Sequence, residues 1–277
     1  MSKNLLRDLG YPAAAVAIAF LLGALLVLAT GFSPLDIYGA LWRGAIGSLE
    51  NVAWSLQNAT PLVFTGLAVA LAFRAGLFNV GAEGQLILGA FAAAEVGVWA
   101  KGTALDTPGV LLPLAVLAGA LAGGVWGAIP GWLKARMGVH EVINTIMMNF
   151  IAALLGSWFL TVAWIKEPGS VPQTPLISPN AVLPPASFIN PYTRLNAGFL
   201  LAVAAVFLVW YLLWRTWPGF ELRVVGLNAD AATYAGASVG RTTIGVMFAS
   251  GALAGIGGAE QVLGVHYHFI KDFWVGL

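Results

Sequence analysis

This sequence of 277 residues contains no cysteine and few charged residues. With no cysteine, the chain offers no disulfide, no thiolate metal ligand and no catalytic thiol. Only 9% of its residues are charged, against roughly 25% in a soluble domain. That is too little charge to cover a water-facing surface of this size. The net charge of +1 argues against a nucleic-acid partner.

Motifs for catalysis and nucleotide binding are also missing. The sequence contains no G-x-x-x-x-G-K-[ST] loop, no H-E-x-x-H motif and no visible Ser/His/Asp arrangement. We therefore expect the chain not to be an enzyme, and to hold neither a metal nor a cofactor. If it moves a solute against a gradient with ATP, a partner chain must bind the ATP.

Hydrophobic residues dominate what is present. They make up 59% of the chain, the mean hydropathy is +0.85, and several apolar runs approach the roughly 20 residues that cross a bilayer as a helix. The pattern predicts an all-α polytopic membrane protein, with residues 1–277 as one transmembrane domain. About seven spans are expected: Ala13–Phe32, Val52–Phe73, Phe78–Ala100, Val110–Leu133, Glu141–Ile165, Ala197–Trp214 and Thr242–Leu263.

Small residues recur every fourth position in two of these spans. Gly119, Gly123 and Gly127 lie in the fourth span, and Gly251 and Gly255 lie in the seventh. Such small-xxx-small pairs let membrane helices approach closely, so they predict tightly packed helix faces.

Basic residues indicate the orientation of the chain. With a cytoplasmic N-terminus, eight of the 13 Lys and Arg residues fall inside, as the positive-inside rule expects. The tight turns at Arg74 and Lys134 lie inside, and so does the connection 215–241. The connection 165–196 holds half of the 14 prolines, so it is predicted to be an external loop. The predicted location is the cytoplasmic (inner) membrane of the cell, crossed several times.

The interval Arg215–Arg241 is the longest polar-rich stretch on the predicted inner side. Its centre, Gly226–Gly236, predicts a short amphipathic helix bracketed by glycines, with Asn228 as the N-cap. A short helix held between two spans is suited to contact with a soluble partner. By spacing alone, an ordinary cytoplasmic loop is the commoner interpretation.

Polar side chains at the start of the third span are candidates for a substrate path, because such groups are costly inside a membrane. Asn79 and Glu83 are four residues apart and are expected to share a helix face, with Gln85 pointing roughly the other way. Gly81 and Gly84 favour an irregular helix start, which is typical of transporter sites. The alternative is that Asn79 and Glu83 cap or bridge helices near the cytoplasmic surface.

The fifth span contributes Asn144 and Asn149 to the candidates, with Asn149 expected to lie deeper. A buried asparagine must bond another helix or a ligand, and helix–helix bonding is the commoner use. Glu95 and Glu260 are placed near outer span ends, where they reach the interface. Trp99 and several other tryptophans cluster near span ends, as in an aromatic belt.

Three segments together resemble a known family. They are Phe78–Gln85 (FNVGAEGQ), His140–Asn149 (HEVINTIMMN) and Gly226–Gly236 (GLNADAATYAG), the last followed by Ser250–Gly255 (SGALAG). The combination is similar to the membrane permease subunits of bacterial ABC importers, in the nucleoside and simple-sugar group allied to ribose and branched-chain amino-acid permeases. The first two segments look more like the nucleoside branch than the ribose branch.

The resemblance implies a set of partners. An ATPase subunit would bind ATP and dock on a coupling helix, which corresponds here to Gly226, Asn228, Ala229, Asp230, Ala231, Ala232, Tyr234, Ala235 and Gly236. An external solute-binding protein and a second permease subunit, often a different chain in this branch, would complete the importer in the lipid membrane. The family also has further spans after the seventh, so the sequence is expected to be truncated at its C-terminus.

The leading hypothesis is therefore a nucleoside permease of a binding-protein-dependent ABC importer. Its expected substrate path uses Asn79, Glu83, Gln85, Asn144 and Asn149, whose polar groups can bond ribose hydroxyls or base edges. One alternative is a simple-sugar permease of the ribose type. An alternative from another class is a proton-coupled secondary transporter with Glu83 as its proton site.

Overall fold

A computed structural model describes residues 2–107, 109–162, 166–169, 171–187 and 193–270. The fold is all-α, as the sequence predicts. Contacts between residues divide the chain into two units, residues 1–55 and 56–277, which are described separately. The prediction that they act as one transmembrane domain stays a prediction.

The first unit contains α1 (Ser2–Ala29), α2 (Pro34–Ile46) and the start of α3 (Leu49–Arg74). The Tyr38 hydroxyl donates to the Phe20 carbonyl oxygen at 2.6 Å, and the two rings meet edge to face. The connection after the first predicted span is helical over Pro34–Ile46. Ser33 begins α2, because its hydroxyl accepts a hydrogen bond from the Asp36 amide.

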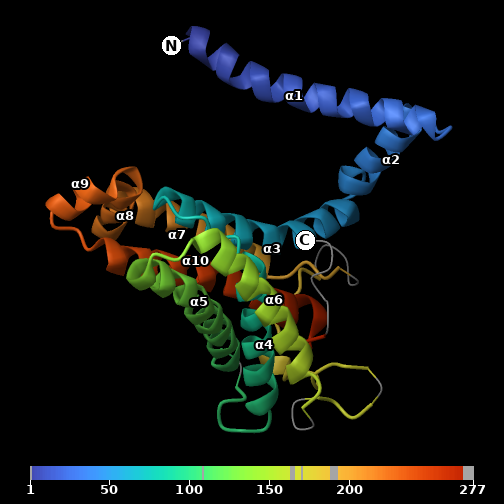
Figure 1. Ribbon diagram of the computed structural model, residues 1–277. Helices are drawn as coiled ribbons and strands as arrows, with labels where there is room; N and C mark the ends of the chain where they lie inside the picture. Colours follow the sequence, from blue (N-terminus) through green and yellow to red (C-terminus); the bar gives the residue numbers. More distant parts are fainter. Residues whose placement is uncertain (1, 108, 163–165, 170, 188–192, 271–277) are drawn as a thin grey trace. The chain divides into compact units, whose positions relative to one another are not determined.

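The second unit is a helical bundle that continues from α3 (Figure 1). Its further elements are α4 (Ala82–Trp99), α5 (Leu111–Met137), α6 (Glu141–Phe159), the short 3-10 turn η1 (Pro179–Ala181), α7 (Gly198–Arg215), α8 (Trp217–Leu227), α9 (Ala229–Tyr234), α10 (Val239–Glu260) and the π-helical η2 (Gln261–His266).

Six helices in the described part of the chain are long and apolar enough to span a membrane. They correspond to six of the seven predicted spans. The third predicted span is α4, which starts at Ala82 rather than Phe78 and carries Glu83, Gln85 and Glu95. The fifth ends at Phe159, before the predicted end at Ile165, which lies outside the described residues. The chain is a multi-pass membrane protein.

Helices α5 and α10 pack backbone against backbone along the predicted small-residue faces. A Cβ atom added at Gly123 would collide with the carbonyl oxygen of Gly251, and one at Gly255 would collide with that of Gly119. The close packing predicted from the glycine spacing is therefore confirmed. Helix α10 also packs on α4, so it forms the centre of the bundle.

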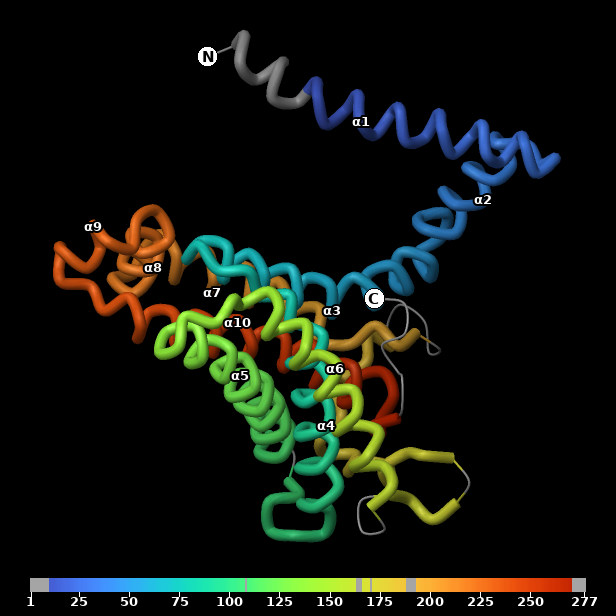
Figure 2. Tube along the Cα trace, in the orientation of Figure 1, coloured from blue at the N-terminus to red at the C-terminus, as the bar shows by residue number. Residues whose placement is uncertain are grey.

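The connections gather at two ends of the bundle (Figure 2). At one end, a Cβ atom at Gly76 would lie 3.3 Å from the carbonyl oxygen of Gly226, so the α3–α4 connection meets α8. At the other end, the Ser178 amide donates to the Gly97 carbonyl oxygen at 2.9 Å. The predicted assignment of the connections to two sides of a membrane stays a prediction, as does the side that faces the cytoplasm.

Candidate functional site

Helix α4 begins inside the bundle rather than at its edge. The chain leaves α3 at Arg74 and passes through non-helical residues 75–81 before α4 starts beside Ser250, which lies midway along α10. The first N–H groups of any helix have no partner within the helix, so a buried start needs partners from elsewhere. The irregular start predicted from Gly81 and Gly84 is confirmed, and its N–H groups bond Asn79 just before the helix and Asn149 of α6.

The first set of partners is a closed network of buried side chains. The Asn79 side-chain amide donates to Gln85 Oε1 at 2.9 Å and to Ser250 Oγ at 2.7 Å. Asn79 Oδ1 accepts from Gln85 Nε2 and from the Gly81 amide, both at 3.0 Å. Ser250 in turn donates to the Ala68 carbonyl oxygen of α3 at 2.6 Å. The network ties α3, α4 and α10 together.

The second set comes from α6. Asn149 Oδ1 accepts a hydrogen bond from the Gly84 amide, and its Nδ2 donates to the Val80 carbonyl oxygen, both at 2.9 Å. A Cβ atom on Gly84 would lie 2.9 Å from Asn149 Oδ1, so glycine is needed for this approach. Of the two uses left open for Asn149, the structure shows bonding between helices.

Two expectations for this region are wrong. Asn79 and Glu83 do not share a helix face, because residue 79 precedes the helix; Asn79 is buried and Glu83 is exposed. Gln85 does not point away from Asn79 but bonds it. Asn144 lies on α6 with its Nδ2 atom buried and without a hydrogen-bond partner in the described chain.

The segment Gly226–Gly236, predicted to contain a coupling helix, forms a second feature, at the end of the bundle that holds residues 75–78. The Asn228 side chain caps α9, because its Oδ1 accepts from the Ala231 amide at 2.9 Å. Helix α9 ends at Tyr234, and Gly236 follows with a φ of +87°. The predicted short helix, its cap and its closing glycine are confirmed. The interval 215–241 differs from the prediction in holding a second helix, α8, which the sequence analysis missed.

Helix α8 is fixed against the membrane helices. A Cβ atom at Gly226 would collide with the Arg74 carbonyl oxygen, so α8 touches the end of α3 directly. The guanidinium groups of Arg223 and Arg74 lie over the Trp214 ring, 4.5 Å and 5.5 Å from its centre. Helix α8 is therefore held against the ends of α3 and α7.

Helix α9 projects from α8 (Figure 1). Ala232 is fully buried, whereas the other named coupling residues are exposed or, at Gly226, half-buried. Two large apolar side chains are almost free of contacts: Leu227 is 87% exposed and Tyr234 is 94% exposed. Leu227 is a candidate residue for contact with a partner protein, and it was not among the residues selected from the sequence. An exposed leucine beside a helix cap is the signal that could have identified it.

Glu260 was expected to reach the membrane interface, and this is wrong. It is only 2% exposed and accepts hydrogen bonds from Asn196 Nδ2 at 2.8 Å and Gln261 Nε2 at 2.7 Å. Gly198 leaves room for its side chain, since a Cβ atom there would collide with it. The bonds attach the loop before α7 to the end of α10, where the helix widens into η2.

The loop 165–196, predicted to be external, packs on Asp106, which lies in the α4–α5 connection. Ser178 Oγ and Asn180 Nδ2 of the loop donate hydrogen bonds to the Asp106 carboxylate, and so does the Gly102 amide of the connection itself. These bonds hold the pKa of Asp106 below its ordinary value, the Gly102 amide contributing most. Within the described residues, no group of three His, Asp or Glu side chains could hold a metal ion.

Comparisons with known proteins agree with this architecture. A family model described as "Branched-chain amino acid transport system / permease component" matches residues 51–277. The guanosine ABC transporter permease protein NupP of Bacillus subtilis (strain 168) is 42% identical over 276 residues, which cover 98% of this chain and 77% of the relative. The nucleoside ABC transporter permease protein NupB of Lactococcus lactis subsp. cremoris (strain MG1363) is 36% identical over 276 residues, or 98% and 75% of the two chains.

A glucose ABC transporter permease protein of Haloferax volcanii is 36% identical over 275 residues, which cover 96% of this chain and 71% of the relative. No solved structure matches the chain. The family model covers all of the second unit, including the start of α4 and the α8–α9 segment. The chain therefore belongs to the family of branched-chain amino acid transport system permease components.

Proposed function

We propose that the chain is the permease subunit of an ABC importer that carries nucleosides across the cytoplasmic membrane. The observation that carries the proposal is the similarity over nearly the full chain to the guanosine and nucleoside permeases. The segment Gly226–Gly236, proposed to couple to the ATPase, projects from the bundle and is fixed to α3 and α7 through α8. These features support an importer driven by a separate ATPase subunit, which binds the ATP.

The docking site for that ATPase is α9 with its two exposed apolar flanks. Leu227 and Tyr234 offer apolar area to a groove on the partner, and Asn228 keeps α9 helical without help from the partner. Ala232 is packed against the chain itself and holds α9 in place. A movement of the ATPase is passed to Gly226 and from there to the end of α3.

The substrate path is proposed to pass the start of α4. Asn79, Gln85 and Asn149 are occupied with bonds to other helices, so their part is to shape the wall. Glu83 and Asn144 keep polar atoms that the described chain does not satisfy, and these are the groups that can meet a solute. A carboxylate facing lipid is costly, so the face with Glu83 is covered by a second permease subunit or lines a watery path.

A second permease subunit, most simply a different chain, and an external binding protein complete the proposed importer. The binding protein delivers the solute to the end of the bundle with the loop 165–196. ATP binding and hydrolysis then shift α8 and α9, and the tightly packed helices rock to open the other side. Because the binding protein selects the solute, the path itself needs only weak contacts.

Uptake in a bacterial strain that lacks nucleoside transport tests the proposal. Cells that produce the chain with its ATPase, second permease and binding protein are expected to accumulate labelled guanosine. Omission of the ATPase should abolish uptake, whereas uptake that persists and collapses with a protonophore would indicate a secondary transporter. Competition by glucose or ribose but not by unlabelled nucleosides would show a sugar permease instead.

The docking site is tested by Leu227→Asp and Tyr234→Asp in the same cells. Each places a charge in the apolar contact, so ATP-dependent uptake should fall at least tenfold while the permease is still found in the membrane. Trp132→Phe, an exposed change on α5, is the control. If the ATPase still co-purifies with both variants and uptake is unchanged, α9 is not the docking helix.

A further inference from the structure

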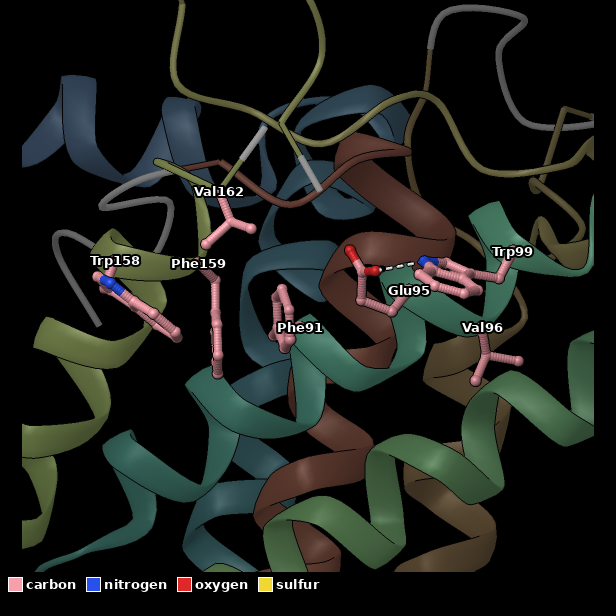
Figure 3. A pocket seen from close by; sticks show the side chains of 7 residues that line it. All are labelled: Phe91, Glu95, Val96, Trp99, Trp158, Phe159 and Val162. Carbon is pink, nitrogen blue, oxygen red and sulfur yellow. Dashed lines mark hydrogen bonds between the residues drawn. The ribbon is translucent and has the colours of Figure 1, made fainter. Parts of the chain in front are cut away.

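A cavity of about 720 Å³ lies between α4 and α6, at the end of the bundle with the loop 165–196. Figure 3 shows its lining, which comes from the last turns of α4 and from the end of α6 and the residues after it. The lining residues are Phe91, Glu95, Val96, Trp99, Trp158, Phe159 and Val162. Small-molecule sites typically measure about 300–1,000 Å³, so the cavity has room for a nucleoside.

Aromatic rings make one wall of the cavity. The Phe91 and Phe159 rings stack with their centres 4.1 Å apart and their planes 11° apart, and the Trp158 ring follows 5.5 Å from Phe159. Trp158 remains 58% exposed, although it lies beside a packed aromatic pair. A flat aromatic ligand can stack on such a wall or place its edge against it.

Among the described residues of the lining, Glu95 is the only one with an ionisable side chain. Its Oε2 atom accepts a hydrogen bond from Trp99 Nε1 at 2.7 Å, which fixes the carboxylate at the cavity (Figure 3). Its Oε1 atom is buried and has no hydrogen-bond partner in the described chain. A buried acceptor without a partner costs roughly 1–3 kcal/mol, so a ligand that donates an N–H or O–H group to it is favoured.

We propose that this cavity is an outer acceptor site for the base of a 6-oxopurine nucleoside, such as guanosine or inosine. The inference rests on the proposed nucleoside import and names the part of the solute that is recognised. The base presents two flat faces to the aromatic wall. Its ring N–H, together with the amino group in guanine, donates to the Glu95 carboxylate.

Other solutes fit this lining less well. A sugar carries hydroxyl groups all round, and the cavity has too few polar groups to satisfy them. Adenine places an acceptor ring nitrogen next to its amino group, so that nitrogen would face the carboxylate oxygens. The site therefore prefers 6-oxopurines to adenine, and pyrimidine nucleosides cover less of the aromatic wall.

Equilibrium binding of labelled guanosine to the purified transporter complex, without the binding protein, tests the site directly. Glu95→Gln replaces the acceptor by an amide, and Glu95→Asp withdraws the carboxylate from the cavity. Both are expected to weaken guanosine binding about tenfold, with little effect on adenosine. Trp158→Leu should weaken the binding of both guanosine and adenosine. Glu50→Gln and Trp132→Phe, exposed residues outside the cavity, should leave binding unchanged.

Uptake in proteoliposomes that contain the whole importer separates the possible failures. If the wild-type importer accumulates no nucleoside, the proposed function fails. If it accumulates guanosine while the Glu95 variants keep wild-type affinity and the same guanosine-to-adenosine ratio, the cavity is not the acceptor site, although the function stands. Displacement of bound guanosine by glucose as readily as by inosine would overturn the purine assignment.

Discussion

The polar side chains at the two ends of α4 differ in how fully they are hydrogen-bonded. At its start, Asn79, Gln85 and Ser250 satisfy one another within the bundle. Near its end, Glu95 accepts a hydrogen bond from Trp99 with one oxygen, and its other oxygen is buried without a hydrogen-bond partner in the described chain. A saturated network has no hydrogen-bonding capacity left for a ligand and serves the fold, whereas an unpaired acceptor beside a cavity keeps that capacity for a solute. The comparison predicts that mutations at the start damage stability, and that those at the end damage binding.

The largest loss of stability is expected for Asn79→Leu. The change leaves the Gln85 amide buried without its partner, which should lower the free energy of unfolding by about 2–4 kcal/mol. Thermal unfolding of the detergent-solubilised complex measures the effect. Asn79→Leu combined with Gln85→Leu should recover part of the loss, because both partners are then apolar. Lost uptake with unchanged stability in Asn79→Leu would mean that Asn79 serves the solute.

A smaller loss is expected for Asn149→Leu. Asn149 satisfies the Gly84 amide at the start of α4, and loss of such a cap costs about 1 kcal/mol. The same unfolding measurement applies, with the exposed Asn58→Leu on α3 as the control. If Asn149→Leu unfolds like the wild type while uptake falls, the side chain belongs to the substrate path and not to the helix cap.

The Asp106 contacts at the far end should give a weak dependence on pH. Their hydrogen bonds lower the pKa of Asp106 below its ordinary 3.8, so the stability they contribute is present above that pH and is lost on further acidification. We therefore expect Asp106→Asn to unfold more easily than the wild type at pH 7, with the difference shrinking toward pH 3. A difference that does not change with pH would contradict this assignment.

The smallest effect on stability is expected for Glu95→Leu. The substitution removes one hydrogen bond to Trp99, whose ring is 62% exposed, so the unfolding temperature should barely change. Guanosine binding to the same preparation should nevertheless be lost. An unfolding temperature that falls as far as that of Asn79→Leu would remove the contrast between the two ends of α4.

Hydrophobic runs were enough to predict most of the fold. They located six spanning helices, and the four-residue glycine spacing correctly indicated tightly packed faces on α5 and α10, although it did not show that these two helices pack on each other. Length alone could not place the start of α4, because one of its first N–H groups, that of Gly84, is satisfied by Asn149, more than sixty residues later in the chain. Helix α8 was missed for a related reason: Trp217–Leu227 contains a proline and two glycines and depends on tertiary contacts, such as that of Gly226 with the end of α3.

The candidate site was harder to predict from the sequence. The polar residues were found, but the face that each one occupies was assigned by helical spacing across a segment that is not helical. Asn228 and α9 were predicted well, because capping is a local interaction. Glu95 and Glu260 were both placed at the interface. Their different partners, Trp99 in one case and Asn196 in the other, follow from packing that spacing does not encode.

The central position of α10 has a consequence for how the protein is made. Synthesis proceeds from the N-terminus, so α3, α4 and α5 enter the membrane before α10 exists. Until then, Gly119 and Gly123 lack the α10 backbone that they meet in the folded protein, and Asn79 lacks the Ser250 hydroxyl. The core of the bundle is therefore closed by a helix that arrives after the helices it joins. Membrane insertion must keep the earlier helices near one another until that arrival.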